Sequence, residues 1–86
     1  MRLAIRLYIS GGFTLIANLT LIQVFYHVAE QGSFSAAARN LGMSYQSVSN
    51  HVRRLEQIIG NKLIDSERGG RQVCLTPRGR ILFKLL

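Results

Sequence analysis

Amide and guanidinium side chains recur at helical spacing between residues 45 and 57. Four of them share one face of a helix because they lie at i, i+4, i+7 and i+11: Gln46, Asn50, Arg53 and Gln57. An amide can pair with adenine through one donor and one acceptor, and a guanidinium can pair with guanine O6 and N7. This face therefore predicts contact with base edges. The alternative is a polar face that contacts only solvent.

Neighbouring residues extend the predicted contacts. We expect Gln46, Ser47, Asn50 and Arg53 to contact bases, because the first turns of such a helix usually reach base edges. Ser49 could contact either a base or the backbone. Arg54 is expected on a phosphate. Tyr45 could pack its ring inward and direct its hydroxyl to a phosphate, or it could be an ordinary packing residue.

The opposite face of the same segment is apolar. It carries Val48, Val52, Leu55 and Ile59 at the same intervals, which predicts a buried stripe. Ser44 is placed to cap this helix and is also one of the predicted DNA-binding residues; Gly60 is placed to end the helix. A short alanine-rich helix is expected just before it, over Ala36 to Leu41, capped by Ser33 or Ser35 and broken by Gly42. Helix, tight turn and helix together predict a helix-turn-helix.

A hairpin is expected after the helix-turn-helix. Two short strands, 63–67 and 72–75, flank the tip Arg68-Gly69-Gly70-Arg71. Arginines beside glycines can lie along the DNA backbone or in the minor groove, so Arg68 and Arg71 join the predicted DNA-binding residues. The alternative is a mobile solvated turn. Arg39, on the short helix, is a further candidate for phosphate contact.

The two ends of the chain carry patterns of their own. Residues 2–10 alternate with period two and predict a strand, Gly11-Gly12 a turn, and Phe13 to Ala17 a second strand with a bulge or longer loop. The next helix is then capped by Asn18 or Thr20, carries an apolar stripe and ends at Gly32. Thr76-Pro77 opens a last helix, whose apolar side consists of Ile81, Leu82, Leu85 and Leu86.

Composition limits the classes of function. The 86 residues suffice for one domain, 1–86, and their net charge of +7 favours a polyanion, nucleic acid before an anionic membrane. The lone Cys74 allows no internal disulfide and is expected to be packed in a strand; with no partner it makes a metal site unexpected. His27 and His51 are isolated and are interpreted as core or boundary residues. We expect no catalytic constellation, cofactor or membrane segment, a cytoplasmic location, and no room for an effector domain.

Several motifs together resemble a known family. Residues 33–39 (SFSAAAR), Val48-Ser49, residues 53–56 (RRLE) and residues 75–79 (LTPRG) resemble the N-terminal domain of LysR-type transcriptional regulators, over about residues 21–83. The leading hairpin, residues 42–45 (GMSY) and Gly69-Gly70 are more similar to molybdate-responsive ModE-type regulators. Tyr45-Gln46 and Ser66 depart from the LysR pattern and leave the subfamily open.

The resemblance implies a DNA-binding transcriptional regulator that acts as a dimer, with the helix after Thr76-Pro77 supporting dimerisation. The alternative is that the apolar side of this helix packs back on the first helix. The expected fold is mainly α with small β: a winged helix-turn-helix of three core helices and a hairpin wing, preceded by an N-terminal hairpin (1–17) and followed by the start of a C-terminal helix (76–86). The expected function is sequence-specific binding of double-stranded DNA, with helix 45–57 in the major groove and the tip 68–71 on the backbone or in the minor groove. The rival is a protein-interaction module on the same fold.

Overall fold

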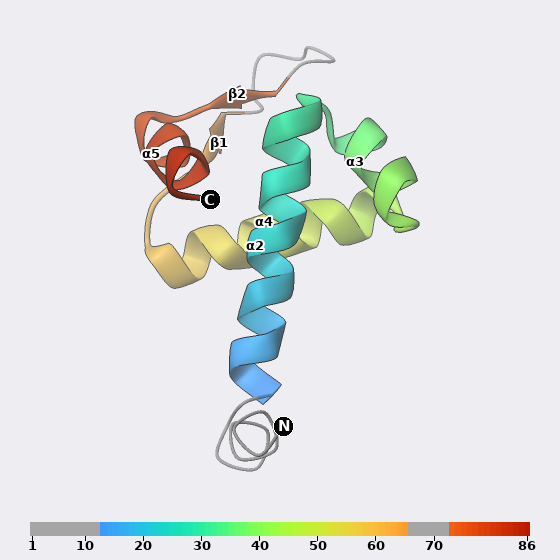
Figure 1. The fold of residues 1–86 in the computed structure, drawn as a ribbon, viewed down its shortest axis with the longest axis horizontal. Helices are drawn as coiled ribbons and strands as arrows, with labels where there is room; N and C mark the ends of the chain where they lie inside the picture. The colour runs from blue at the N-terminus through green and yellow to red at the C-terminus, as the bar shows by residue number, and fades with distance from the viewer. Residues whose placement is uncertain (1–12, 66–72) are drawn as a thin grey trace.

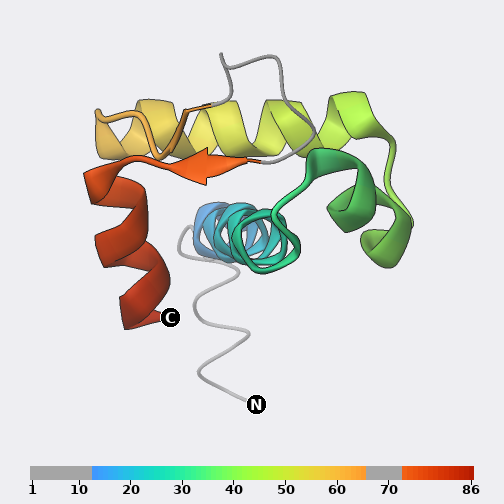
Figure 2. The same cartoon turned by 90° about the horizontal axis from the view of Figure 1, so that it is seen from above.

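The computed structural model describes residues 13–65 and 73–86. In order, these form helix α2 (Phe13–Gln31), helix α3 (Phe34–Leu41), helix α4 (Tyr45–Ile59), strand β1 (Ile64–Asp65), strand β2 (Cys74–Leu75) and helix α5 (Pro77–Leu85) (Figure 1). Seen from above, α4 runs along one face, α2 crosses it, and α3 and α5 flank α2 (Figure 2). This is the predicted mainly helical fold with a small sheet.

The prediction of a second strand over Phe13 to Ala17 is wrong, because these residues are helical. They form the first turns of α2, so Asn18 and Thr20 lie inside a helix and do not cap one. Each residue added to an existing helix gains a hydrogen bond, whereas a lone two-stranded hairpin is marginally stable in water. Helix extension therefore prevails here. The predicted strand 2–10 and the Gly11-Gly12 turn lie outside the described residues.

The core lies where α2, α3 and α4 meet. Phe25 and Val28 of α2, Ala37 of α3 and Val48 of α4 are fully buried. Ala37 and Ala38 present only methyl groups, which lets α3 lie close to α4. The predicted stripe of α4 is buried at Val48, Val52 and Leu55. Ile59 is an exception at 40% exposed, because α4 ends there, beyond the helices that cover the stripe.

Caps and turns set the angle between α3 and α4. The Ser33 hydroxyl accepts a hydrogen bond from Ala36 N, so Ser33 is the cap and α3 begins at Phe34, two residues earlier than expected. Gly42 adopts φ +66°, a left-handed conformation that L side chains avoid, and ends α3. The predicted reversal at Gly42 is thus confirmed.

The wing, residues 63–75, is anchored on the core. Its strands pair antiparallel, Ile64 with Leu75 and Asp65 with Cys74; the rest of the predicted strands and the tip lie outside the described residues. Cys74 is exposed, contrary to prediction, because nothing described covers the outer side of this two-stranded sheet. Thr76 caps α5 by accepting from Gly79 N, with Pro77 at the first turn as expected.

Candidate nucleic-acid interface

The polar face of α4 points out of the molecule. Val48, Val52 and Leu55 turn inward, and the side chains opposite them are exposed: Gln46, Asn50, Arg53, Arg54 and Gln57. Figure 2 shows α4 along one edge of the fold, with α2 lying across its inner side. The sequence prediction of which face is buried is therefore confirmed, and we call Gln46, Asn50, Arg53 and Gln57 the outward face of α4.

The beginning of α4 is fixed by a side-chain cap. The Ser44 hydroxyl oxygen accepts from Ser47 N at 3.0 Å, which satisfies one of the free N–H groups of the first turn. Ser47 and Ser49 are half-buried, one on each flank of the outward face. Ser44 thus positions the first turn of α4. The residue is also exposed, at the beginning of the helix that carries the outward face.

Two residues of the outward face are joined to each other. Gln46 Nε2 donates to Asn50 Oδ1 at 3.1 Å. This bond uses one lone pair of the Asn50 oxygen and involves neither the Asn50 amide hydrogens nor the Gln46 oxygen. The pair therefore presents donors at Asn50 and an acceptor at Gln46. Their i, i+4 spacing was the signal for this contact, which the sequence reasoning did not use.

Tyr45 lies beside the outward face and outside the core. Its side chain is 55% exposed, and its ring lies 5.7 Å from the ring of Phe34, measured between centroids. The contact supports the expected packing, but the ring rests on the edge of α3 and is not buried. Its hydroxyl group is therefore carried at the surface near the beginning of α4.

Glu56 ties α4 to the wing, a role that sequence reasoning missed. Its Oε2 atom accepts from the backbone N–H of Leu63 at 2.8 Å and of Ile64 at 3.2 Å. The only signal was that Glu56 is the one acidic residue on α4. By holding the first residues of the wing, Glu56 fixes the wing relative to the outward face.

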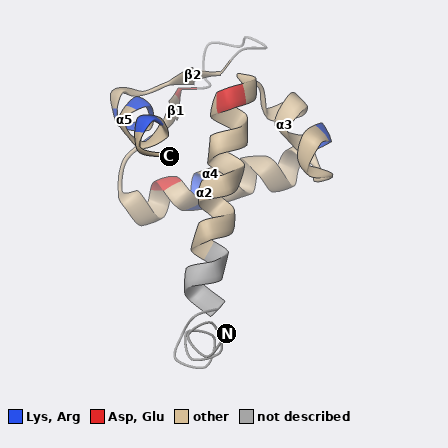
Figure 3. Cartoon of the chain, in the orientation of Figure 1, with Lys and Arg blue, Asp and Glu red and all other residues tan. Residues whose placement is uncertain are grey.

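A basic hollow of about 380 Å³ lies between α4 and the wing. Its lining brings Lys62, which sequence reasoning did not single out, to the same surface as Arg53 and Ser49; the other lining residues are Phe34, Val52, Glu56 and Ile64. Figure 3 shows the basic positions of the described residues on α3, α4 and α5. Arg39 is exposed on α3. Arg68 and Arg71 lie outside the described residues.

His51 occupies the flank of α4 that faces α2. Its Nδ1 atom lies 2.6 Å from the carbonyl oxygen of Ser47, and the ring is half-buried. Together with Leu21, Asn50 and Arg54 it lines a hollow of about 350 Å³. His27 is also half-buried, on α2, which agrees with the expectation of boundary histidines.

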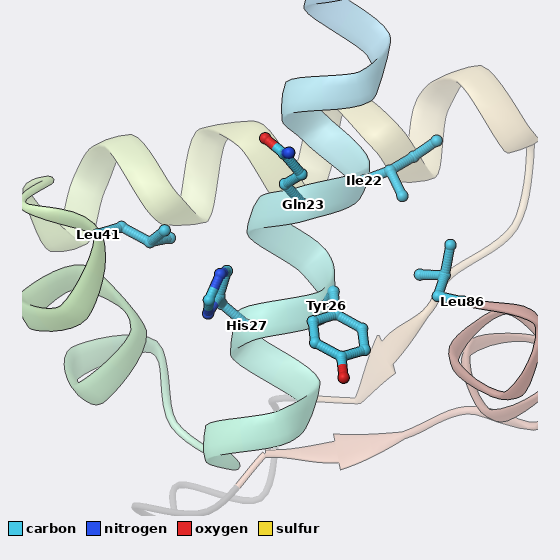
Figure 4. A pocket seen from close by; sticks show the side chains of 6 residues that line it. All are labelled: Ile22, Gln23, Tyr26, His27, Leu41 and Leu86. Carbon is cyan, nitrogen blue, oxygen red and sulfur yellow. The ribbon is translucent and has the colours of Figure 1, made fainter.

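A separate pocket of about 360 Å³ lies along α2 (Figure 4). Gln23, Tyr26 and His27 line it with three aliphatic residues, Ile22, Leu41 and Leu86. A hydrogen bond to Glu30 raises the pKa of Tyr26 above its ordinary value, and the negative charge of Glu30 adds to the shift. This stabilises the neutral phenol, so the pocket offers no activated nucleophile at Tyr26.

Metal and membrane chemistry find no support in residues 13–65 and 73–86. No three His, Cys, Asp or Glu side chains of these segments come together as metal ligands, and none of their helices combines the length and the apolar character needed to span a bilayer. What the described part of the chain offers is a helix-turn-helix with an exposed second helix and an adjoining wing. The fold and this surface define a winged helix-turn-helix protein.

Comparison with known proteins identifies the family. Residues 19–80 match the family described as bacterial regulatory helix-turn-helix protein, lysR family. The chain belongs to this family. It is 44% identical over 66 residues to the HTH-type transcriptional regulator PtxR of Pseudomonas aeruginosa, covering 77% of this chain and 20% of PtxR. It is also 44% identical over 67 residues to the HTH-type transcriptional activator AaeR of Escherichia coli. That match covers 78% of this chain and 21% of AaeR.

Solved structures agree with this assignment. The BenM_DBD/catB site 1 DNA complex aligns with a TM-score of 0.71 and 31% identity, covering 78% of this chain and 73% of that one. The OxyR C206 mutant of Corynebacterium glutamicum aligns with a TM-score of 0.71 and 34% sequence identity. The alignment covers 78% of this chain and 21% of the OxyR chain. The chain spans about a fifth of the length of the curated relatives named above. Those relatives carry the names of transcriptional regulators.

Proposed function

We propose that this chain binds double-stranded DNA sequence-specifically as the DNA-binding part of a bacterial transcriptional regulator, with α4 in the major groove. One observation carries the proposal: α4 buries its apolar stripe and exposes amides and guanidinium groups on the opposite side. Such groups pair with base edges, and an α-helix fits the width of the major groove. The similarity to the chain in the BenM_DBD/catB site 1 DNA complex supports the same reading.

Each exposed residue has a proposed role. Base contacts are assigned to Gln46, Ser47, Asn50 and Arg53, and Arg54 is assigned to a phosphate. Ser49 serves either a base or the backbone, and the Ser44 and Tyr45 hydroxyls serve the backbone beside the start of α4. Arg68 and Arg71, at the tip of the wing, are proposed to contact the backbone or the minor groove, with Arg39 as a further phosphate contact.

Selection from random duplexes, followed by substitution of Arg53, tests the proposal. We expect Arg53→Ala to weaken binding to the selected site by about 1–3 kcal/mol and to relax the preference at one base position. Arg80→Ala is the matched control, because it removes the same charge from an exposed position on α5. An equal loss in both variants would remove Arg53 from base reading. A folded chain that ignores duplexes at low ionic strength would refute DNA binding and favour a protein-interaction module.

We also propose that the regulator is a homodimer in which α5 contributes to the contact. Leu82 and Phe83 pack on the core, and Phe83 lies 5.3 Å from Tyr26 between ring centroids. The rest of the apolar side of α5 stays exposed, with Leu85 at 78% and Ile81 at 56%. Leu85→Asp should therefore leave folding intact and shift the sedimentation of the chain toward monomer; unchanged sedimentation of a dimeric parent would exclude α5.

We propose that an effector domain lies elsewhere in the regulator, because the chain spans about a fifth of the length of its relatives. We also propose a cytoplasmic location, since the regulator acts on DNA. The likeness to ModE-type regulators stays a prediction, and it has lost part of its basis because residues 13–17 are helical.

A further inference from the structure

We infer that the hollow between α4 and α2 holds one phosphate of the DNA backbone and that His51 binds it only as the protonated imidazolium, so DNA binding takes up a proton. This inference rests on the proposed function. It adds a contact residue that the outward face of α4 does not include, and it makes the affinity depend on pH.

The tautomer of His51 follows from its backbone contact. A carbonyl oxygen only accepts hydrogen bonds, so at 2.6 Å from Ser47 O the Nδ1 atom of His51 must carry a hydrogen and donate it. In the neutral ring the other nitrogen, Nε2, is then an acceptor. It becomes a donor only when the ring is protonated. His51 can therefore bind an anion through Nε2 in its cationic form alone.

The other polar groups of the hollow supply mostly donors. The Asn50 oxygen already accepts one bond from Gln46 Nε2, so the Asn50 amide hydrogens are the groups that this residue adds for a ligand. Arg54 is exposed and carries donors only. Leu21 supplies an apolar wall from α2. Such donors fit a phosphate, whose oxygens are acceptors and carry negative charge.

The position of the hollow suits the DNA backbone. His51 and Arg54 lie on one flank of the outward face, and Asn50 joins the flank to that face. A helix seated in the major groove points its outward face at the bases and its flanks at the two phosphate strands. The hollow would therefore meet a phosphate while Arg53 meets a base.

Within the described helices, one charged group shares the hollow with His51. The other titratable or charged groups on α2, α3 and α4 are Tyr26, His27 and Glu30 on α2, Arg39 on α3, and Tyr45, Arg53, Arg54 and Glu56 on α4. Of these only Arg54 lines the hollow. A phosphate bound there would favour the charged form of the His51 ring, because opposite charges attract. Affinity is therefore highest at low pH and falls as pH rises through the range in which imidazoles lose their charge.

The test measures binding of the 86-residue chain to a rhodamine-labelled duplex of mixed sequence, at fixed ionic strength, between about pH 5.5 and pH 8. We expect the wild-type affinity to be about tenfold higher at the acid end, since a phosphate near an imidazole favours its charged form by about one pKa unit or more. His51→Gln should abolish this dependence. His27→Gln, which removes the other histidine, should keep it. A pH dependence that survives in His51→Gln would overturn the inference.

Two further measurements make the test independent of how His51→Gln folds. The first follows the His51 ring protons by NMR in the wild-type chain, where the duplex should raise the pKa of His51; no rise would overturn the inference. The second uses Arg54→Ala, which should reduce the salt dependence of binding by about one counterion at every pH; an unchanged dependence would count against a phosphate in this hollow. If even the wild-type chain ignored the duplex at low ionic strength, the proposed function itself would fail.

Discussion

Replacing Gly79 with alanine tests how the wing and α5 are held together. Gly79 is buried in the first turn of α5, against the backbone of Leu63. A Cβ added there would lie 2.9 Å from the Leu63 carbonyl carbon and closer still to its oxygen. That carbonyl already accepts from Thr76 N at 3.0 Å, so it is held by the residue that caps α5. The clash therefore meets backbone that cannot move aside cheaply.

Two effects of opposite sign decide the outcome of Gly79→Ala. In an ordinary helix interior, alanine stabilises by about 1 kcal/mol relative to glycine. Overpacking of a well-packed site costs about 1–3 kcal/mol, and a backbone obstacle puts this site at or above the upper end. We expect a net loss of about 2 kcal/mol in the free energy of unfolding. At about 4–8 °C per kcal/mol for a domain of this size, the melting temperature should fall by about 8–16 °C.

Urea denaturation followed by circular dichroism measures this loss. Arg80→Ala is the control, because Arg80 is exposed on the same helix and its replacement should change the free energy of unfolding by less than about 0.5 kcal/mol. A Gly79→Ala protein as stable as its parent, or more stable, would refute the argued contact between α5 and Leu63.

Two other substitutions probe the core of α4 and its link to the wing. Val52→Asp places a charge at a site 3% exposed, which should cost more than about 4 kcal/mol and abolish the cooperative melt; a parent-like melt would refute the assignment of faces. Glu56→Ala should destabilise by about 1–3 kcal/mol for each buried N–H left unsatisfied at Leu63 and Ile64, in urea denaturation. Glu56→Gln keeps an acceptor and should be nearly as stable as the parent. Equal losses of unfolding free energy in both variants would contradict the role of Glu56 as acceptor for the Leu63 and Ile64 N–H groups.

The sequence by itself determined the helix-turn-helix and the orientation of α4. Val48, Val52 and Leu55 share a helical period, and the caps Ser33, Ser44 and Thr76 act within three residues of their partners. Signals of this kind depend on the chain only a few residues away. For that reason the caps and the buried stripe of α4 could be predicted from the order of residues alone. The same pattern predicted which polar side chains face outward.

Tertiary structure decided where α2 begins, what Glu56 does and why Gly79 is required. Residues 13–17 fit a strand by their local pattern, and their continuity with a packed helix determined the outcome. Glu56 finds its donors seven and eight residues away, and Gly79 of α5 meets the backbone of Leu63, sixteen residues earlier in the chain. The hollow at His51 likewise needs Leu21 from another helix. Contacts between distant segments carry no periodic signal, so only the packed fold could place them.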